Sequence, residues 1–222
     1  ARDGKIDPIS DIETIDTIED GATVFDGGAG NDWIQYVSAG GDLTIDLAAG
    51  IGSGDIAEGD RYVSVENVII TPRRITTSEG GTETVSYRWT NDRIIGTDGA
   101  NQIDGGGGAD DISAGGGDDY LIGRRGAARY DGGSGLDTVD YEADGTGPVT
   151  VDLAAGAGSA GAATGHVYLS VEAVVGTTFD DRLTGGANSD YLTGGLGADR
   201  LDGGDGIDTA VYRNAAVIVD LA

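Results

Sequence analysis

The feature that most constrains this chain is a nine-residue repeat, Gly-Gly-x-Gly-x-Asp-x-U-x, in which U is a large apolar residue. Units in nine-residue phase begin at 87, 96, 105, 114, 123 and 132, and again at 167, 176, 185, 194 and 203. This register is typical of a repeat architecture and not of a disordered segment. The Gly and Asp positions are fully met in GGAGNDWIQ from Gly27, GGGGADDIS from Gly105, GGSGLDTVD from Gly132, GGLGADRLD from Gly194 and GGDGIDTAV from Gly203.

Each position of the repeat has a physical role. Glycine permits positive φ, so the backbone can turn tightly with its carbonyls pointing inward at a cation. The aspartate supplies hard carboxylate oxygens, which calcium takes in shells of six to eight. The U residue alternates with polar neighbours, which indicates a very short strand with one inward side chain. Two units make one coil of about 18 residues, and stacked coils predict an all-β parallel β-roll with two short-stranded parallel sheets.

The predicted core of this roll is thin, with one inward side chain per nine residues. Such a core does not offset the entropy of ordering so much glycine unless a bound metal contributes to folding. The inward residues are expected to be Ile34, Ile103, Ile112, Leu121, Val139, Leu183, Leu192 and Leu201.

Composition excludes several classes of function. The chain has 42 Gly, 39 acidic against 13 basic residues, and a formal net charge of −26. Nucleic acids and anionic membrane surfaces are disfavoured as partners, because no basic stripe exists to neutralise phosphates. The absence of cysteine excludes disulfides and thiolate zinc sites. No apolar run approaches the roughly 18 residues of a transmembrane segment.

The nonapeptides resemble those of the RTX (repeats-in-toxin), haemolysin-type calcium-binding family, closely over 96–140 and 176–211 and partly over 18–35. The resemblance implies a bacterial protein that is secreted, extracellular or at the cell surface. It also implies type I secretion machinery as a partner, with folding when the exported chain meets calcium. Whether a cell surface or a carbohydrate is a further partner is left open.

The resemblance also implies where the ions lie, because calcium in this family sits between the turns of adjacent coils. The carboxylate partners would then be 18 residues apart, and about four to seven Ca²⁺ ions are expected. Glu172 is expected to face Asp190. The five other pairs would be Asp92 with Asp110, Asn101 with Asp119, Asp119 with Asp137, Asp181 with Asp199, and Asp190 with Asp208. Backbone contributions are expected at Gly105, Gly107, Gly132, Gly194 and Gly203.

Two positions depart from the pattern. The unit from Gly123 has Ala128 where the aspartate is expected, so the site between Asp110 and Ala128 should be weak or empty. The charge there is expected to come instead from Arg124, Arg125 or Arg129. Asp32 belongs to an isolated perfect unit, and whether it holds an ion is left open.

Longer repeated segments lie between the nonapeptide blocks. LTIDLAAGIGSG from Leu43 resembles VTVDLAAGAGSA from Val149, and YVSVENVI from Tyr62 resembles YLSVEAVV from Tyr168. Their alternation predicts strands that continue or cap the roll. Glu79-Gly80-Gly81 predicts a β-hairpin that either packs on the roll's edge, which we favour, or presents a partner-binding tip.

The predicted organisation follows from these blocks. It comprises a partial N-terminal repeat block (1–36), a connecting β segment (37–70), the hairpin insertion (71–93), a first regular block (94–140), a second connecting β segment (141–175), a second regular block (176–211) and the start of a truncated connecting strand (212–222).

The sequence gives no sign of catalysis. It has neither H-E-x-x-H nor G-x-S-x-G, and His166 is its only histidine. We therefore expect a non-enzymatic calcium module that supports secretion and folding of a larger exported protein. The alternatives are a spacer or interaction face of an adhesin or surface-layer protein, and an accessory module of a secreted protease, lipase or alginate epimerase.

Overall fold

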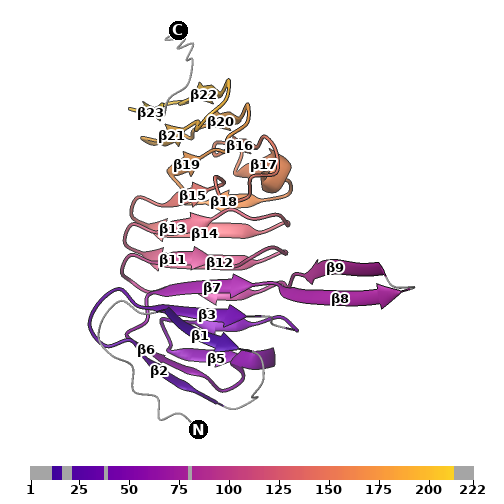
Figure 1. Ribbon diagram of the computed structural model, residues 1–222. Coiled ribbons are helices and arrows are strands. Elements are labelled where there is room, and N and C mark those ends of the chain that lie inside the picture. The colour runs from indigo at the N-terminus through magenta and orange to yellow at the C-terminus, as the bar shows by residue number, and fades with distance from the viewer. Residues whose placement is uncertain (1–11, 17–21, 38–39, 80–81, 213–222) are drawn as a thin grey trace.

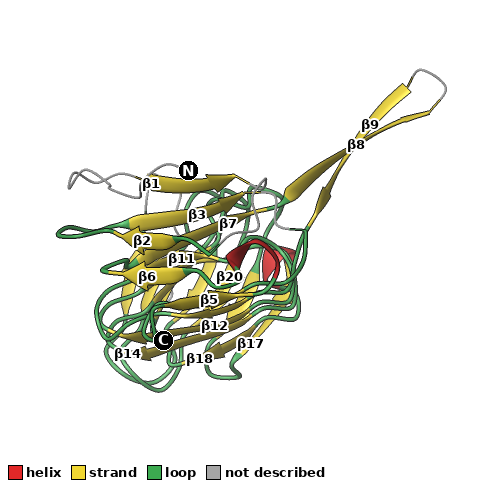
Figure 2. Cartoon of the chain, turned by 90° about the horizontal axis from the view of Figure 1, so that it is seen from below, coloured by secondary structure: helices red, strands yellow, loops and turns green. Residues whose placement is uncertain are grey.

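The computed structural model describes residues 12–16, 22–37, 40–79 and 82–212, and it shows a tall stack of short strands (Figure 1). Two sheets run along the stack and face each other, as the view from below shows (Figure 2). No helix of these residues is long and apolar enough to cross a membrane.

Sheet A has nine strands. In spatial order they are β1 (Ile12–Asp16), β3 (Trp33–Val37), β7 (Asn67–Thr71), β11 (Gln102–Asp104), β13 (Tyr120–Ile122), β15 (Thr138–Asp140), β19 (Ala173–Val175), β21 (Tyr191–Thr193) and β23 (Thr209–Val211).

Sheet B has twelve strands. In spatial order they are β2 (Val24–Asp26), β6 (Arg61–Val63), β5 (Ile51–Ser53), β4 (Thr44–Asp46), β10 (Arg93–Ile95), β12 (Asp111–Gly116), β14 (Arg129–Ser134), β18 (Val167–Leu169), β17 (Ala157–Ala160), β16 (Thr150–Asp152), β20 (Arg182–Thr184) and β22 (Arg200–Asp202).

The regular part of the roll climbs by one coil every 18 residues. Ile94 lies beside Ile112 in parallel strands of sheet B, and Leu121 lies beside Val139 in sheet A. Because successive side chains of a strand point to opposite faces, the U residue of each unit faces the opposite sheet. The predicted parallel β-roll is confirmed. Of the predicted inward residues only Leu201 is half-buried, and the others are buried.

The two connecting segments enter sheet B as antiparallel meanders. In the first, β5 pairs antiparallel with both β4 and β6, and the 3₁₀ turn η1 (Asp55–Ala57) joins β5 to β6. The second repeats this arrangement with β16, β17, η2 (Gly161–Ala163) and β18. Sheet A gains no strands there, because Ile34 of β3 lies directly beside Val68 of β7 across the first insertion, and Val139 of β15 beside Val174 of β19 across the second. Sheet B therefore has two extra strands at each insertion, about 10 Å of added width, and must curve locally.

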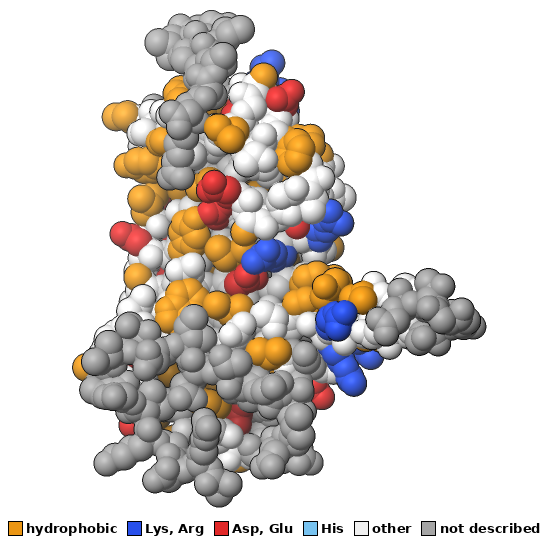
Figure 3. Space-filling model, in the orientation of Figure 1, with side chains coloured by type: hydrophobic (Ala, Val, Ile, Leu, Met, Phe, Trp, Pro, Cys, Tyr) orange, Lys and Arg blue, Asp and Glu red, His pale blue; other side chains and the backbone are white. Residues whose placement is uncertain are grey.

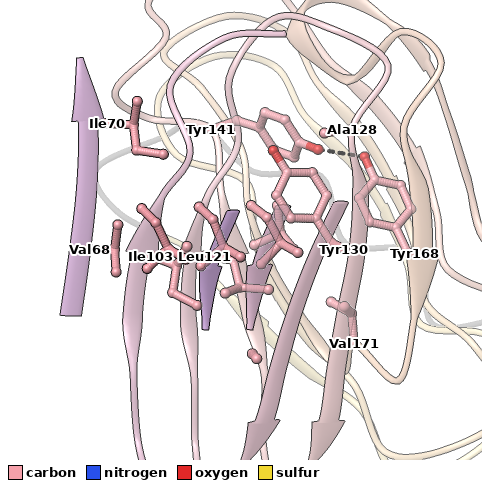
Figure 4. Close-up of a cluster of buried hydrophobic side chains, with 14 of the residues drawn as sticks. Val68, Ile70, Ile103, Leu121, Ala128, Tyr130, Tyr141, Tyr168 and Val171 are labelled. Atoms are coloured by element: carbon pink, nitrogen blue, oxygen red, sulfur yellow. Dashed lines mark hydrogen bonds between the residues drawn. The ribbon is translucent and has the colours of Figure 1, made fainter. Parts of the chain in front are cut away.

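These insertions also thicken the core beyond the predicted single row. Tyr36 is fully buried, and its hydroxyl bonds to Asp60 Oδ2 at 2.7 Å and to the Tyr62 hydroxyl at 2.6 Å. The second insertion repeats this arrangement, with the Tyr141 hydroxyl bonded to His166 Nδ1 at 2.7 Å and to the Tyr168 hydroxyl at 2.5 Å (Figure 4).

Burial fixes the charge state of the second cluster. It lowers the pKa of His166 to about 4, so this imidazole is neutral at pH 7.

The hairpin of β8 (Arg73–Glu79) and β9 (Thr82–Arg88) projects sideways from the roll (Figures 1 and 2). The side chains of residues 73–77 and 84–89 are exposed, so the favoured prediction that the hairpin packs on the roll's edge is wrong. Arginines lie beside apolar side chains at its base (Figure 3). At this base the Trp89 ring lies 2.9 Å from the position that a Cβ on Gly107 would take.

Candidate metal centre

The loops between the two sheets form two edges, and the residue that precedes each strand forms a row along each edge. We call the loops that lead from sheet B to sheet A the BA edge, and the loops that lead from sheet A to sheet B the AB edge. On the BA edge the row is continuous, because the strands that follow are direct neighbours in sheet A, and each of its members in the coils from β3 to β23 is polar. Its members are Asp32, Glu66, Asn101, Asp119, Asp137, Glu172, Asp190 and Asp208.

The AB edge is interrupted. Asp92 and Asp110 lie on adjacent coils, and the next two positions are Ala128 and His166. Beyond the second insertion the row resumes with Asp181 and Asp199. The row on the BA edge thus crosses both insertions, whereas the row on the AB edge is interrupted.

The predicted 18-residue pairs are brought together by one recurring hydrogen bond. The backbone amide of the earlier residue donates to Oδ1 of the aspartate one coil later, over 2.7–3.0 Å. This bond joins Asp92 to Asp110, Asn101 to Asp119, Asp119 to Asp137, Asp181 to Asp199, and Asp190 to Asp208. The second carboxylate oxygen lies near the first glycine of the same unit, as Oδ2 of Asp137 does beside Gly132.

Glycines allow the coils to approach this closely. Gly133 has φ +99 and Gly126 has φ +140, and a Cβ on either would clash with the carbonyl oxygen of the residue 18 positions earlier, Gly115 or Gly108. The first glycine of a unit lies instead against the carboxylate of the same unit. This holds for Gly105, Gly132, Gly194 and Gly203, whereas Gly107 lies against the Trp89 ring and the Arg125 carbonyl.

The paired carboxylates are buried at positions that disfavour their charged form. Burial, with the charges of neighbouring aspartates added, raises the pKa of Asp110 to about 8 and of Asp119 to about 7. Burial likewise raises the pKa of Asp92 to about 6. The pKa is raised by the same cause in Asp137, Glu172, Asp181, Asp190 and Asp199. A cation between adjacent coils would reverse this penalty.

Three buried carboxylate oxygens lack any hydrogen-bond partner among the described residues: Oδ2 of Asp32, Asp119 and Asp137. A buried unpaired oxygen of this kind is unfavourable unless a cation or another donor satisfies it. Nowhere in the described part do three acidic or histidine side chains converge in a metal-binding group. A complete shell would therefore combine two carboxylates with loop carbonyls, which are hard oxygen ligands that suit calcium.

The gap at Ala128 is filled by the aromatic core. Ala128 is 2% exposed and belongs to the same hydrophobic core cluster as Tyr141 and Tyr168 (Figure 4). The nearby arginines do not supply charge to Asp110, contrary to prediction. Arg124 pairs with Asp104, Arg125 with Asp144, and Arg129 with Asp111 and Asp131.

Sequence reasoning missed Glu66 on the BA edge and the contact of Glu172 with Asp137. The Asp32 amide donates to Glu66 Oε2 at 2.9 Å, and the Asp137 amide donates to Glu172 Oε2 at 3.2 Å. The charge of Asp190 also raises the pKa of Glu172, so Glu172 lies between Asp137 and Asp190. These partners are 34 and 35 residues apart because each insertion lengthens the connection. The shared Ser-Val-Glu of the two segments was the available signal.

Comparison with known proteins agrees with this geometry. Four stretches of the chain match the family described as RTX calcium-binding nonapeptide repeat, four copies: residues 17–35, 88–121, 108–139 and 175–210. No curated protein matches the chain.

Proposed function

Because this chain belongs to the RTX calcium-binding nonapeptide repeat family, we propose that it is a module that folds when it binds several calcium ions outside the cell. In this role it would support type I secretion and folding of a larger exported protein. About four to seven ions would bind between coils, with carbonyls of the glycine-rich loops completing their shells.

The observation that carries this proposal is the arrangement of Asp119 and Asp137. Both are almost completely buried, both keep an unpartnered Oδ2, and the raised pKa of each reflects burial together with neighbouring negative charge. Such pairs recur along both edges. Because their ionised carboxylates are buried and repel one another, the roll is unstable when no cation is bound. Because metal binding is then coupled to folding, the chain would stay unfolded where calcium is scarce and fold where it is abundant.

Circular dichroism during a calcium titration, with a chelator control, tests the proposal. Calcium should convert a largely unfolded spectrum into a β-rich one, and chelation should reverse the change. Magnesium at equal concentration should substitute poorly, because it requires a compact octahedron and loses its water reluctantly. A β-rich spectrum that precedes calcium and survives chelation contradicts the proposal.

The exposed hairpin favours a second candidate function, an interaction face of an adhesin or surface-layer protein. Isolated two-stranded hairpins are only marginally stable in water. Here Tyr87 is 56% and Trp89 is 49% exposed, which suits a surface that is covered by a partner. The variant Tyr87→Ser should then lower adhesion of the parent protein to its cell surface while its calcium-dependent folding stays intact. Unchanged adhesion would argue against this role.

A further inference from the structure

We propose that two Ser-Val-Glu loops, residues 64–66 and 170–172, each close an additional calcium site over the nonapeptide loop beneath, with Glu66 and Glu172 as carboxylate ligands. Both loops lie outside the stretches that match the RTX repeat. The inference rests on the proposed calcium-dependent function and extends it to segments that have no nonapeptide.

The geometry of these loops copies that of a nonapeptide pair. Glu66 accepts the amide of Asp32 at 2.9 Å, as Asp137 accepts the amide of Asp119 at the same distance. Glu172 accepts the amide of Asp137 at 3.2 Å. A glutamate on a short loop therefore takes the place that an aspartate on a six-residue glycine loop takes elsewhere.

A backbone carbonyl reaches each site as well. The Ser64 carbonyl lies so close to Gly27 that a Cβ on that glycine would clash with it, and this Cβ would also be 2.7 Å from Cγ of Asp32. Ser170 and Gly132 repeat the relationship, with Oδ2 of Asp137 at 2.5 Å from the Cβ position. Both serines have positive φ, 50 and 47, so the two loops share one unusual backbone conformation.

A buried oxygen aimed at each site supplies independent evidence for a ligand. Asp32 is 7% and Asp137 is 0% exposed, and Oδ2 of each has no hydrogen-bond partner among the described residues. No described donor reaches this oxygen, and the Ser64 or Ser170 carbonyl lies beside the same nonapeptide loop. A hard divalent cation with an irregular oxygen shell satisfies these oxygens, and calcium tolerates such a shell better than magnesium does.

Glu66→Gln separates an ionic role from a structural one. Glutamine keeps an oxygen that can accept the Asp32 amide, so a purely structural Glu66 would tolerate the change. Asp26→Asn is the matched control, because Asp26 is an exposed carboxylate next to the same nonapeptide loop. Terbium is a second probe, since Trp33 directly follows Asp32 and would sensitise emission from an ion bound there.

Equilibrium dialysis of the full chain should show one calcium ion fewer for Glu66→Gln, and one fewer for Glu172→Gln, than for the wild type and Asp26→Asn. Glu66→Gln should also lower terbium emission excited through tryptophan, which Glu172→Gln should affect less. Should one variant fail to fold in saturating calcium, the other provides the same test. An unchanged ion count in a folded variant overturns the inference alone, whereas a wild type that binds no calcium overturns the proposed function with it.

Discussion

The backbone amide of Asp119 donates a 2.9 Å hydrogen bond to Oδ1 of Asp137, while Oδ2 of both side chains is buried without a partner among the described residues. One oxygen of Asp137 thus fixes the register of two coils, and the other is available to a cation between them. The fold and the proposed calcium sites depend on the same side chains.

Asp119→Asn should weaken calcium binding more than a single-site change does, because Asp119 faces both Asn101 and Asp137. Asparagine keeps an oxygen for the amide bond and removes the charge. We expect the midpoint of the calcium titration to rise, together with a lower ion count by dialysis. The exposed Asp202 is the control, and an equal effect from Asp202→Asn would contradict the assignment.

The raised pKa values predict how stability depends on pH without calcium. A carboxyl whose pKa is higher in the folded than in the unfolded chain favours folding when protonated, and this contribution is lost as pH rises through the folded value. For Asp110 this contribution is lost between about pH 4 and about pH 8. For Asp119 it is lost between about pH 4 and about pH 7.

In chelator, the roll should therefore be more stable at pH 5 than at pH 8, by an amount on the order of a few kcal/mol. With saturating calcium this trend should vanish or reverse, because protons compete with the ion. Circular dichroism in chelator at both pH values tests this through the fraction of folded chain, and urea unfolding tests the calcium-loaded roll. More β structure at pH 8 than at pH 5 in chelator would contradict the electrostatic account.

Gly126→Ala should destabilise the roll far more than the strain of an alanine at positive φ would by itself. Its φ is +140, and a Cβ would clash with the Gly108 carbonyl of the neighbouring coil. Gly145→Ala is the control, since Gly145 also has positive φ, +58, but no atom within 4 Å of a Cβ. The control should cost about 1 kcal/mol, and Gly126→Ala should cost several times more in thermal unfolding with calcium present.

Ala128→Asp should destabilise the roll rather than restore a calcium site. The side chain is buried in the same hydrophobic core cluster as Tyr141 and Tyr168, and a carboxylate placed there without a partner costs roughly 2–5 kcal/mol. A lower melting temperature and an unchanged ion count are expected. One additional calcium per chain with a raised melting temperature would show that the gap is a true site.

Tyr141→Phe should cost about 1–3 kcal/mol, because it leaves His166 Nδ1 and the Tyr168 hydroxyl without their shared partner in a buried cluster. Tyr191→Phe serves as the control, since Tyr191 is 43% exposed. Denaturant unfolding in calcium measures the difference, and equal stability of the two variants would contradict the assigned role of the cluster.

Local pattern was enough to predict the regular coils. Ile112 and Leu183 are buried where the nine-residue phase places them, and Asp181 meets Asp199 at the expected 18 residues. The contact between Asp32 and Glu66 could not be found by that spacing. It depends on how β4 and β5 are accommodated within sheet B, which is a non-local pairing that the repeat does not encode.

The same limit applies to the aromatic clusters and the hairpin. Tyr36 and Tyr62 meet only after the meander of the first insertion has folded. Alternation predicted the strands of the hairpin, but it carries no information on whether the hairpin lies against the roll or projects from it.

Anomalous diffraction from crystals grown in calcium tests the central claim most directly, because it locates the ions. The account predicts peaks between the carboxylates of Asp119 and Asp137, Asp181 and Asp199, and Asp190 and Asp208, with none beside Ala128. Crystals of the folded chain that show no peak between these pairs, or peaks only at exposed carboxylates, would contradict it.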